Sequence, residues 1–421
     1  MSMTIYKYPS KKYIGVSIDI PASYCYNCIW QIMNTVRKKL NIINRIKRKA
    51  AWIVFSVLPK NQNKVVFQSF YGRGYSDSPR AIAEELRRRG GCRLYWNVKS
   101  DADAASLPED ITPLRLHSIR GIFHNATAGF WVDNCRKETY VRKGKKQFYI
   151  QTWHGFPLKR IEKDAGVKAL GQSYVNSARY DSSMCDLFTS DSAFLTDLYH
   201  SSFWYDGKVQ QLGLPRNDML INPPGGVCEK VRSAFNVDGE THLMLYAPTF
   251  RRDRGLEVYD IDYRRVCAAL SRRFGGRWLI LAKLHPNIAS RAKELKFDGV
   301  SVVNASDYPD IHDLYIACDA MITDYSSTMF DFMITGKPSF LYVNDVEAYK
   351  GDRNFYFDLD LLPQTRSGSN DGLEAAILAF NAEDYEARRA AFFKRFGITE
   401  TGEAARGVCN VIERVRAENT F

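Results

Sequence analysis

The segment CDAMITDYSSTMFDFMITGKP, residues 318–338, decides the fold that the sequence predicts. Residues 320–323 are apolar and typical of a short buried strand, and the apolar residues among 329–334 recur at helical spacing before Gly336. Between them lie three residues of the kinds that cap a helix start: Asp324, Ser326 and Ser327. We expect free backbone N–H groups at this helix start, which together with the hydroxyls would suit a diphosphate. The same pattern also fits an ordinary strand-to-helix junction in an α/β domain.

Strand and helix patterns alternate along the chain in two series. The first series has a helix pattern over 79–89 and strand patterns at 64–69, 94–98, 129–132 and 148–153. The second series has strand patterns at 242–247, 278–284, 300–303, 320–323 and 339–343. This alternation predicts an α/β protein with two Rossmann-like, doubly wound domains whose strand ends face a shared cleft.

Turn-forming residues and the last helix patterns set the predicted domain boundaries. Asn222 to Gly226 is rich in Pro and Gly and makes the natural linker. Helix patterns over 384–396 and 403–418 close the chain. We therefore predict a basic segment at 1–60, a first domain at 61–225, a second domain at 226–395 and a closing helix at 396–421.

The positive charge of the chain is concentrated at its amino-terminal end. Lysine and arginine exceed aspartate and glutamate by 12 in the whole sequence. Residues 1–60 hold eleven of the basic residues against Asp19 alone, which leaves 48 basic and 46 acidic residues for everything after them. A globally basic nucleic-acid binder is therefore disfavoured, and no nucleic acid is expected as a partner.

The basic segment also has the pattern of an amphipathic helix. From Ile29 to Leu58, apolar residues recur at three- and four-residue steps with Arg and Lys between them, and Trp30 and Trp52 lie near the two ends. The longest apolar run, 51–55, is far too short to span a bilayer. We expect a peripheral contact with an anionic membrane surface. The alternative is a helix that docks on the protein's own body with a solvated basic face.

No cofactor or metal site is predicted. Nine cysteines are scattered without a disulfide framework or a preceding secretory signal, so a reducing cytoplasm is expected. The turn Gly72-Arg73-Gly74 lacks the third glycine of a dinucleotide fingerprint, and no P-loop occurs. Three Asp-x-Asp triplets are discounted as metal motifs, because an Asp-rich chain produces them freely.

Two histidines follow predicted strands, each with a cation nearby. His154 lies in QTWHGFPLKR, residues 151–160, and His285 follows Lys283 by two positions. A neutral imidazole at one strand end could take a proton from an attacking hydroxyl, and a protonated one at the other could stabilise a transferring phosphoryl group. A lone histidine is more often structural, but two in equivalent places favour catalysis.

Further candidates for anion binding lie at other strand ends. Residues 246–254, YAPTFRRDR, contain three guanidinium groups that suit bidentate phosphate recognition. Lys159 and Arg160 follow His154 and would attract anions. His312 starts a predicted helix after strand 300–303 and could add a phosphate contact.

Taken in order, these motifs resemble the CDP-glycerol glycerophosphotransferase family, whose members make teichoic acids and related capsules. The resemblance covers roughly residues 62–395 and includes further stretches GLPRND at 213–218 and FYFD at 355–358. It implies a glycosyltransferase-B type fold with an amino-terminal acceptor domain and a carboxyl-terminal domain for a CDP-linked donor. It also implies peripheral attachment to the cytoplasmic face of the bacterial cell membrane.

The resemblance carries roles onto matching positions. It implies that His154 is the base of the acceptor half and that His285 lies near the pyrophosphate. We assign donor binding to Arg216, Thr249, Arg251, Lys283, His312, Asp324, Ser326, Ser327 and Asp331. We assign acceptor binding to Gly72, Arg73, Gly74, Gly155, Lys159 and Arg160. Phe156 departs from the family, in which a small hydroxyl residue is common there, and is expected to alter the acceptor pocket.

The chemistry implied is attack by a hydroxyl of a lipid-linked or polymeric, phosphate-rich acceptor on the β-phosphate of CDP-glycerol or CDP-ribitol, with release of CMP. The donor is a substrate, so no cofactor is implied. Two alternatives stay open: a nucleotide-sugar glycosyltransferase of the same fold, and a membrane-associated scaffold without catalysis.

Overall fold

The computed structural model describes residues 52–249, 251, 259, 261–285, 297–345 and 354–419. The chain divides into two units after Ala50, and all described residues belong to the second unit. The predicted arm up to residue 51, including Trp30 and the cysteines at 25 and 28, lies outside the described residues.

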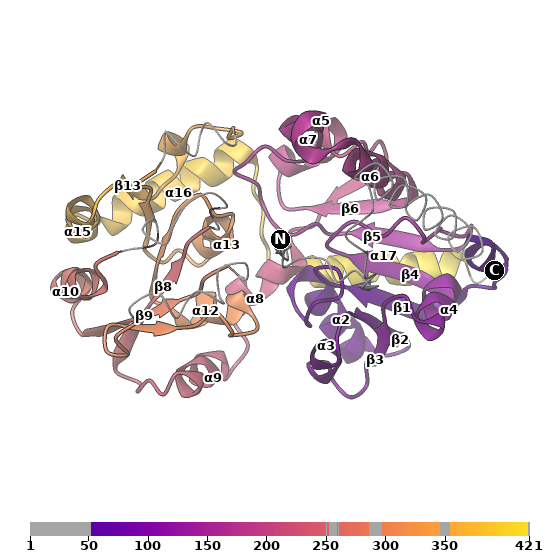
Figure 1. Ribbon diagram of the computed structural model, residues 1–421, viewed down its shortest axis with the longest axis horizontal. Coiled ribbons are helices and arrows are strands. Elements are labelled where there is room, and N and C mark those ends of the chain that lie inside the picture. Colours follow the sequence, from indigo (N-terminus) through magenta and orange to yellow (C-terminus); the bar gives the residue numbers. More distant parts are fainter. Residues whose placement is uncertain are drawn as a thin grey trace, which may run out of the picture. The chain divides into compact units, whose positions relative to one another are not determined.

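Two parallel β-sheets form the framework (Figure 1). The first has seven strands in the order β3-β2-β1-β4-β5-β6-β7, and the second has six in the order β10-β9-β8-β11-β12-β13. The strands of the first sheet are β1 (Asn61–Gln68), β2 (Arg93–Val98), β3 (Thr112–Arg115), β4 (Ala128–Asp133), β5 (Phe148–Gln151), β6 (Leu187–Ser190) and β7 (Lys208–Gln211). Those of the second are β8 (Thr241–Ala247), β9 (Arg277–Ala282), β10 (Val302–Asn304), β11 (Ala320–Thr323), β12 (Ser339–Tyr342) and β13 (Thr365–Ser367).

Helices connect most of the successive strands and cover both sheets. Those that accompany the first sheet are α2 (Asp77–Arg89), α3 (Asp101–Ala105), α4 (Ile119–Thr127), η1 (Glu162–Ala165), α5 (Val167–Leu170), α6 (Gln172–Met184) and α7 (Ala193–Ser202). Between the sheets in sequence come η2 (Pro215–Asn217), α8 (Asp218–Ile221) and α9 (Val227–Ala234). The remainder are α10 (Tyr263–Phe274), α12 (Ile311–Ala317), α13 (Thr328–Ile334), η5 (Leu359–Leu361), α15 (Asn370–Leu378), α16 (Ala382–Phe396) and α17 (Ala404–Asn419).

Each sheet is buried on both faces, as parallel sheets require. In β1, Val66 belongs to one core cluster and its neighbours Val65 and Phe67 to another, because successive side chains point to opposite faces. Met244 and Leu245 divide in the same way between the two cores of the second sheet. These nearly continuous apolar runs are the sequence pattern from which the strands were predicted.

The predicted two-sheet α/β architecture is confirmed, and four strands were missed. Each predicted strand pattern coincides with an observed strand to within a few residues. The missed strands are β3, β6, β7 and β13. Three of these lie at sheet edges, and β7 and β13 have no buried apolar run. A half-exposed edge strand gives no continuous apolar pattern, so sequence periodicity does not reveal it.

The two closing helices form as predicted but pack in different places. Phe392 and Phe396 of α16 belong to an aromatic cluster with Phe330 of the second half. Helix α17, yellow in Figure 1, returns to the first sheet, where Val408 and Ile412 join the core beside α2. The last described helix therefore packs on the half in which the first sheet lies.

The described end of the predicted amphipathic helix packs on the protein itself. Residues 52–57 are helical. The ring of Trp52 stacks on Tyr180 with 5.8 Å between centroids, and its indole N–H donates to the Thr139 carbonyl. Phe55 is fully buried against Trp131. Trp52 therefore packs within the fold, as the alternative of a helix docked on the protein's own body expects for this end of the segment. In the described part of the chain, no helix is long and apolar enough to cross a membrane.

Candidate active site

Most of the predicted site residues follow strands at, or next to, the place where the strand order of each sheet reverses. Strand β1 is followed along the chain by β2 on one side and later paired by β4 on the other, and β8 has the same position in its sheet. Loops at such switch points diverge and leave a crevice at the carboxyl ends of the strands, where ligands bind. The loops after β1 and β5 and those after β8, β9 and β11 carry most of the predicted residues.

The imidazole of His154 is held in one tautomer. Its Nδ1 lies 2.7 Å from the backbone carbonyl of Asn134, an atom that can only accept. Nδ1 therefore carries the proton, and the neutral ring keeps its lone pair on Nε2. Burial lowers the pKa of His154, although the bond to Asn134 opposes this. The structure thus presents a neutral imidazole with the protonation that a general base needs.

The loop that carries His154 is strained and well supported. Trp153 has a φ of 52°, a left-handed conformation uncommon for a bulky residue, and its ring stacks on His154 with 4.2 Å between centroids. The backbone N–H of Trp153 donates to Oε1 of the buried Gln151, whose Nε2 donates to the Cys135 carbonyl. Strain of this kind persists only where surrounding contacts over-determine it, and it is frequent at functional sites.

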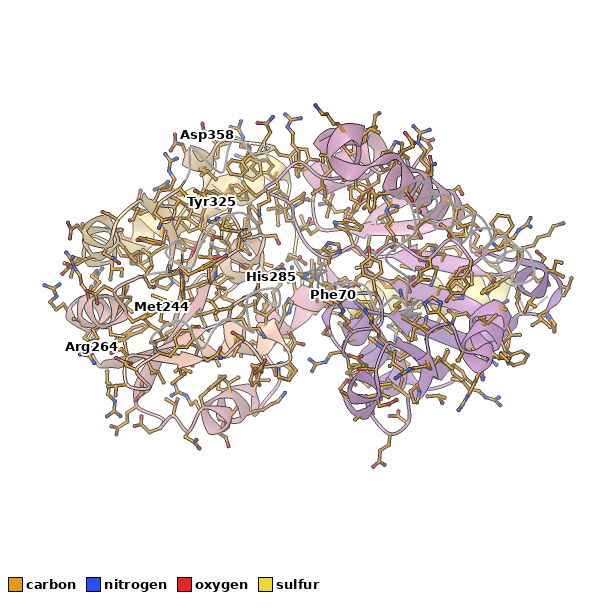
Figure 2. The ribbon with its side chains drawn as sticks, viewed as in Figure 1. Phe70, Met244, Arg264, His285, Tyr325 and Asp358 are labelled. Carbon is orange, nitrogen blue, oxygen red and sulfur yellow. The ribbon has the colours of Figure 1, made fainter. Side chains whose placement is uncertain are left out.

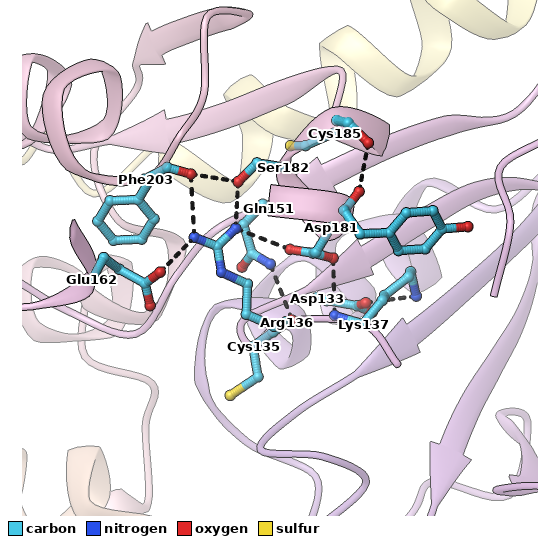
Figure 3. A network of polar contacts seen from close by, with 12 residues as sticks. Asp133, Cys135, Arg136, Lys137, Gln151, Glu162, Asp181, Ser182, Cys185 and Phe203 are labelled. Atoms are coloured by element: carbon cyan, nitrogen blue, oxygen red, sulfur yellow. Dashed lines mark hydrogen bonds and ion pairs between the residues drawn. The ribbon is translucent and has the colours of Figure 1, made fainter. Parts of the chain in front are cut away.

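Beneath this loop lies a buried network of charges (Figure 3). Arg136 follows β4 and pairs with Glu162 at 2.9 Å and Asp181 at 3.1 Å. Its guanidinium lies 5.6 Å from the ring of Trp153, the residue that supports His154. All three charged side chains are nearly inaccessible, so each depends on the others for charge compensation.

Arg216, from η2, links the two halves at the site. Its Nη1 donates to Oδ2 of Asp77 at 2.7 Å and to the His154 carbonyl at 2.8 Å, and its Nη2 pairs with Asp331 of α13. Asp77 starts α2 with a φ of 65° and is 6% exposed. The neighbouring carboxylates, opposing the effect of burial, raise the pKa of Arg216. Arg216 therefore connects the His154 loop with α13, and its guanidinium is already occupied by protein groups.

The residues after His154 pack between the halves. Gly155 has a φ of 119°, and a β-carbon there would lie 3.1 Å from Nη2 of Arg216. Phe156 is 1% exposed and packs on Phe194 and Phe330. Phe156 belongs to the aromatic core, so the expectation that it alters an acceptor pocket is wrong.

The glycine turn after β1 uses most of its backbone N–H groups internally. Gly72 and Arg73 donate to the Ser69 carbonyl, and Gly74 donates to Asp103. Gly72 approaches Leu116 so closely that a β-carbon would lie 2.8 Å from it. The guanidinium of Arg73 is exposed and makes no ion pair with any described residue. Of this predicted acceptor trio, only the Arg73 side chain is thus positioned to meet a ligand.

Lys159 brings the first half close to His285. His285 is exposed after β9, and partial desolvation followed by the charge of Lys159 lowers its pKa. The backbone of Lys159 bridges to Phe355, and Arg160 lies over the ring of Tyr356 at 5.7 Å. Figure 2 labels His285 in the second half and Phe70, which contacts the His154 ring, in the first.

Lys283 is turned toward the protein. Its ammonium donates to the carbonyl of Ser306, at 2.7 Å, and to that of Tyr308. Burial lowers the pKa of Lys283 to about 8. Lys283 therefore holds the loop after β10 in place, beside the position of His285.

The predicted anion site after β11 differs from the expectation in its details. Asp324 does not cap α13: its carboxylate accepts from Thr249, at 2.9 Å to the backbone N and 2.5 Å to Oγ1, and pairs with Arg251 at 2.9 Å. Arg251 also pairs with Asp345 at 2.9 Å. The other two guanidiniums of the predicted cluster, at 252 and 254, lie outside the described residues.

The first turn of α13 has fewer free backbone N–H groups than predicted. Ser327 occupies the cap position with helical backbone angles and no side-chain cap bond. The N–H groups of Met329 and Phe330 donate to the carbonyls of Ser326 and Ser327, and that of Thr328 lies 3.4 Å from Oγ of Ser326. The expectation of free backbone N–H groups is therefore wrong for these three. The half-buried hydroxyls of Ser326 and Ser327 remain at the strand end.

A cavity of about 320 Å³ lies between α2, α8 and the start of α12. It is lined by Arg80 and Arg216 from the first half and by Asp310 and His312 from the second. Arg80 and Asp310 form an ion pair of 2.5 Å across it. His312 is 3% exposed, and its Nε2 has no hydrogen-bond partner among the described residues. His312 begins α12, as predicted.

Sequence reasoning missed several residues that shape this site. The most important are Asp77, Asn134, Gln151, Arg136 and Asp345. The run of polar residues at 133–137 directly after an apolar strand was the available signal, since the same rule found His154. Among the described residues, no group of three or more His, Cys, Asp or Glu side chains could hold a metal ion.

Comparison with known sequences gives one family for nearly the whole chain. The family described as CDP-Glycerol:Poly(glycerophosphate) glycerophosphotransferase matches residues 50–414. The teichoic acid glycerol-phosphate transferase of Staphylococcus aureus strain NCTC 8325 is 30% identical over 88% of this chain and 99% of its own length. The teichoic acid poly(glycerol phosphate) polymerase of Bacillus subtilis strain 168 is 28% identical over 89% of this chain and 54% of its own length.

Solved structures agree with this assignment. The wall teichoic acid polymerase TagF has a TM-score of 0.79 and 28% identity, over 93% of this chain and 99% of that chain. A variant of the same polymerase soaked with CDPG gives the same values. The fold, two parallel sheets of the glycosyltransferase-B-like kind, is therefore shared with TagF. The chain belongs to the CDP-glycerol:poly(glycerophosphate) glycerophosphotransferase family and is an enzyme of that type.

Proposed function

We propose that this enzyme transfers the alditol phosphate of CDP-glycerol or CDP-ribitol to a hydroxyl of a membrane-linked acceptor and releases CMP. The product belongs to a teichoic acid-like or capsular polymer. The observation that carries this proposal is the fixed tautomer of His154, which leaves Nε2 with the lone pair after β5, beside the loop that follows β4.

In the proposed step, Nε2 of His154 takes the proton of the acceptor hydroxyl as its oxygen attacks the β-phosphorus of the donor. A new P–O bond joins acceptor and alditol phosphate, the P–O bond to the bridging oxygen breaks, and CMP leaves with its α-phosphate. General-base help of this kind accelerates a reaction by roughly a hundred- to ten-thousand-fold. The half-buried setting of His154 suits this role, because desolvation lowers its pKa and favours the neutral ring.

The donor diphosphate is proposed to lie at the carboxyl ends of β9 and β11. At these strand ends His285 is exposed, and the hydroxyls of Ser326 and Ser327 are half-buried. The lowered pKa of His285 indicates a neutral ring in the free enzyme, so it would first act as an N–H donor. An arriving diphosphate would raise that pKa and favour the imidazolium, which stabilises charge on the leaving group.

A panel of nucleotide donors tests the function. The purified protein should release CMP from CDP-glycerol or CDP-ribitol in the presence of an acceptor, and should release no nucleoside diphosphate from a set of nucleotide-sugars. The proposal includes no cofactor or divalent metal, so added EDTA should leave the rate unchanged. CMP release from neither CDP-alditol, with turnover of a nucleotide-sugar, would support the glycosyltransferase alternative.

We further propose peripheral attachment to the cytoplasmic membrane through the basic arm. Removal of residues 1–50 should reduce binding to vesicles that contain phosphatidylglycerol at least tenfold, because it removes ten basic residues and one acidic residue. The deletion must stop before Trp52, since Phe55 belongs to the core. Cosedimentation with vesicles measures the effect, and turnover of a soluble acceptor controls for folding. Unchanged vesicle binding would show that the arm has another role.

A further inference from the structure

A short antiparallel contact joins the two halves beside the site. Residues 158–161, which follow the His154 loop, lie against residues 354–357 of the second half, and Lys159 pairs with Phe355 at its centre. Two backbone hydrogen bonds of 2.9 Å flank this pair: Arg160 N–H to the Asn354 carbonyl and Tyr356 N–H to the Leu158 carbonyl. We call these two segments the strap.

Tyr356 anchors the strap, because its side chain enters the first half. Its hydroxyl donates to Oδ2 of Asp164 at 3.0 Å and accepts from the backbone N–H of Ile161 at 3.2 Å. Its ring meets Phe194 edge-on, with 5.6 Å between centroids, and packs against the core cluster of the first sheet. A residue of the second half is thus held in the first by both hydrogen bonds and packing, which fixes the register of the strap.

The other side of the strap lies at the strand end where the donor is proposed to bind. The ring of Phe355 stacks on that of Tyr325 with 5.7 Å between centroids. Tyr325, which Figure 2 labels in the second half, immediately precedes Ser326. Because Lys159 pairs with Phe355, the backbone of Lys159 is held near this strand end.

The ammonium of Lys159 lies beside His285. Successive side chains of an extended segment point to opposite sides, and Leu158 is buried in the aromatic cluster, so Lys159 points away from that cluster. Lys159 is half-buried, and His285 is exposed. Desolvation and, after it, the charge of Lys159 lower the pKa of His285, which requires the two groups to be close. A cation from the first half therefore lies next to a histidine of the second.

We propose that Tyr356 is a positioning residue for the transfer reaction: through the strap, it holds the ammonium of Lys159 against the donor diphosphate. The sequence predicted acceptor binding for Lys159, whereas the strap assigns it to the donor. An ammonium and an imidazole from opposite halves would then share the charge of the diphosphate through charge-assisted hydrogen bonds. The donor site is complete only where the halves meet at the strap. This inference rests on the proposed function, because it takes the CDP-linked donor as the ligand.

Binding of CDP to the full chain, measured by isothermal titration calorimetry, tests the role of Lys159. Lys159→Met removes the charge and keeps most of the side chain, so it should raise the Kd for CDP at least about tenfold. Lys159→Arg should recover most of the affinity, because the cation returns. The matched control is Lys163→Met, whose lost ammonium lies near the Ser201 carbonyl of the first half and which should bind CDP as the wild type does. A Kd for Lys159→Met within twofold of the wild type, or an equal loss in Lys163→Met, would overturn the proposal.

A double-variant cycle tests whether Tyr356 acts through Lys159. Tyr356→Phe keeps the ring in the core and removes only the hydroxyl, so the fold should persist while the Kd for CDP rises about fivefold. The combined variant Tyr356→Phe/Lys159→Met should bind CDP no more weakly than Lys159→Met alone. The pKa of His285, followed by NMR and identified by the signal lost in His285→Gln, should rise in both single variants, since each takes the Lys159 charge away.

Additive losses in the combined variant, or an unchanged pKa of His285 in Tyr356→Phe, would overturn the positioning role. Failure of the proposed function is distinguishable, because the wild type itself would then bind no CDP and release no CMP.

Discussion

Replacement of His154 by alanine should lower kcat/KM for CMP release at least about a hundredfold, because it removes the group that takes the acceptor's proton. The loss should fall mainly on kcat, since a base acts in the transition state and adds little to substrate binding. Steady-state kinetics with the preferred CDP-alditol measure it. His285→Ala should cause a loss of similar size through the donor phosphate.

A matched control for this variant exists in the same half. His200 of α7 also has its Nδ1 near a backbone carbonyl, that of Tyr205 at 3.3 Å, but it lies on a helix away from the strand switch point. His200→Ala should leave kcat/KM within about twofold. If His154→Ala retained more than a tenth of the wild-type value, His154 would not be the base.

The pH profile adds an independent check on the same residue. Burial lowers the pKa of His154 below its usual value of 6.5. A base must be unprotonated, so activity should be present above the folded-state pKa and lost as the pH falls through it. The acid limb of kcat/KM should therefore lie below pH 6.5 in the wild type. The remaining activity of His154→Ala should no longer depend on the ionisation of an imidazole at this position.

Replacement of Arg216 by methionine should have the largest effect on stability. The change leaves the carboxylates of Asp77 and Asp331 buried without their cation, and breaking a buried pair in this way costs about 3–5 kcal/mol. Urea unfolding followed by tryptophan fluorescence measures the loss. Activity should fall as well, because Arg216 also holds the carbonyl of His154.

A compensated variant separates the two effects. In Asp77→Asn/Arg216→Met/Asp331→Asn all three charges of this cluster are removed together, and asparagine tolerates the left-handed backbone at position 77. Most of the stability should return, whereas kcat should stay low because the link from α13 to the His154 loop is absent. Recovery of both would mean that Arg216 only balances charge. If the urea midpoint of Arg216→Met equalled that of the wild type, the result would contradict the two buried ion pairs of Arg216.

Local patterns in the sequence predicted the framework and the approximate place of the site. The apolar runs of β1, β8 and β11 are visible because both faces of a parallel sheet are buried. His154 and His285 were found because they follow such runs. Edge strands such as β7 were not predicted, since half of their side chains face solvent.

The partners of the site residues could not be predicted in this way. Arg216 and Arg251 were expected to bind the donor, yet both guanidiniums are paired with carboxylates. Asp77 and Arg216 are 139 positions apart, so no local pattern connects them. The same holds for the aromatic partners of Phe156 and for the contact of Trp52 with Tyr180.

The sequence by itself determined the two parallel sheets, the histidines at their strand ends and the basic amino-terminal arm, because periodicity and composition are local properties. Only the tertiary structure decided which charged side chains form ion pairs, which tautomer His154 adopts, and which apolar residues remain outside the core. These depend on distances between segments far apart in the chain, which the fold alone sets.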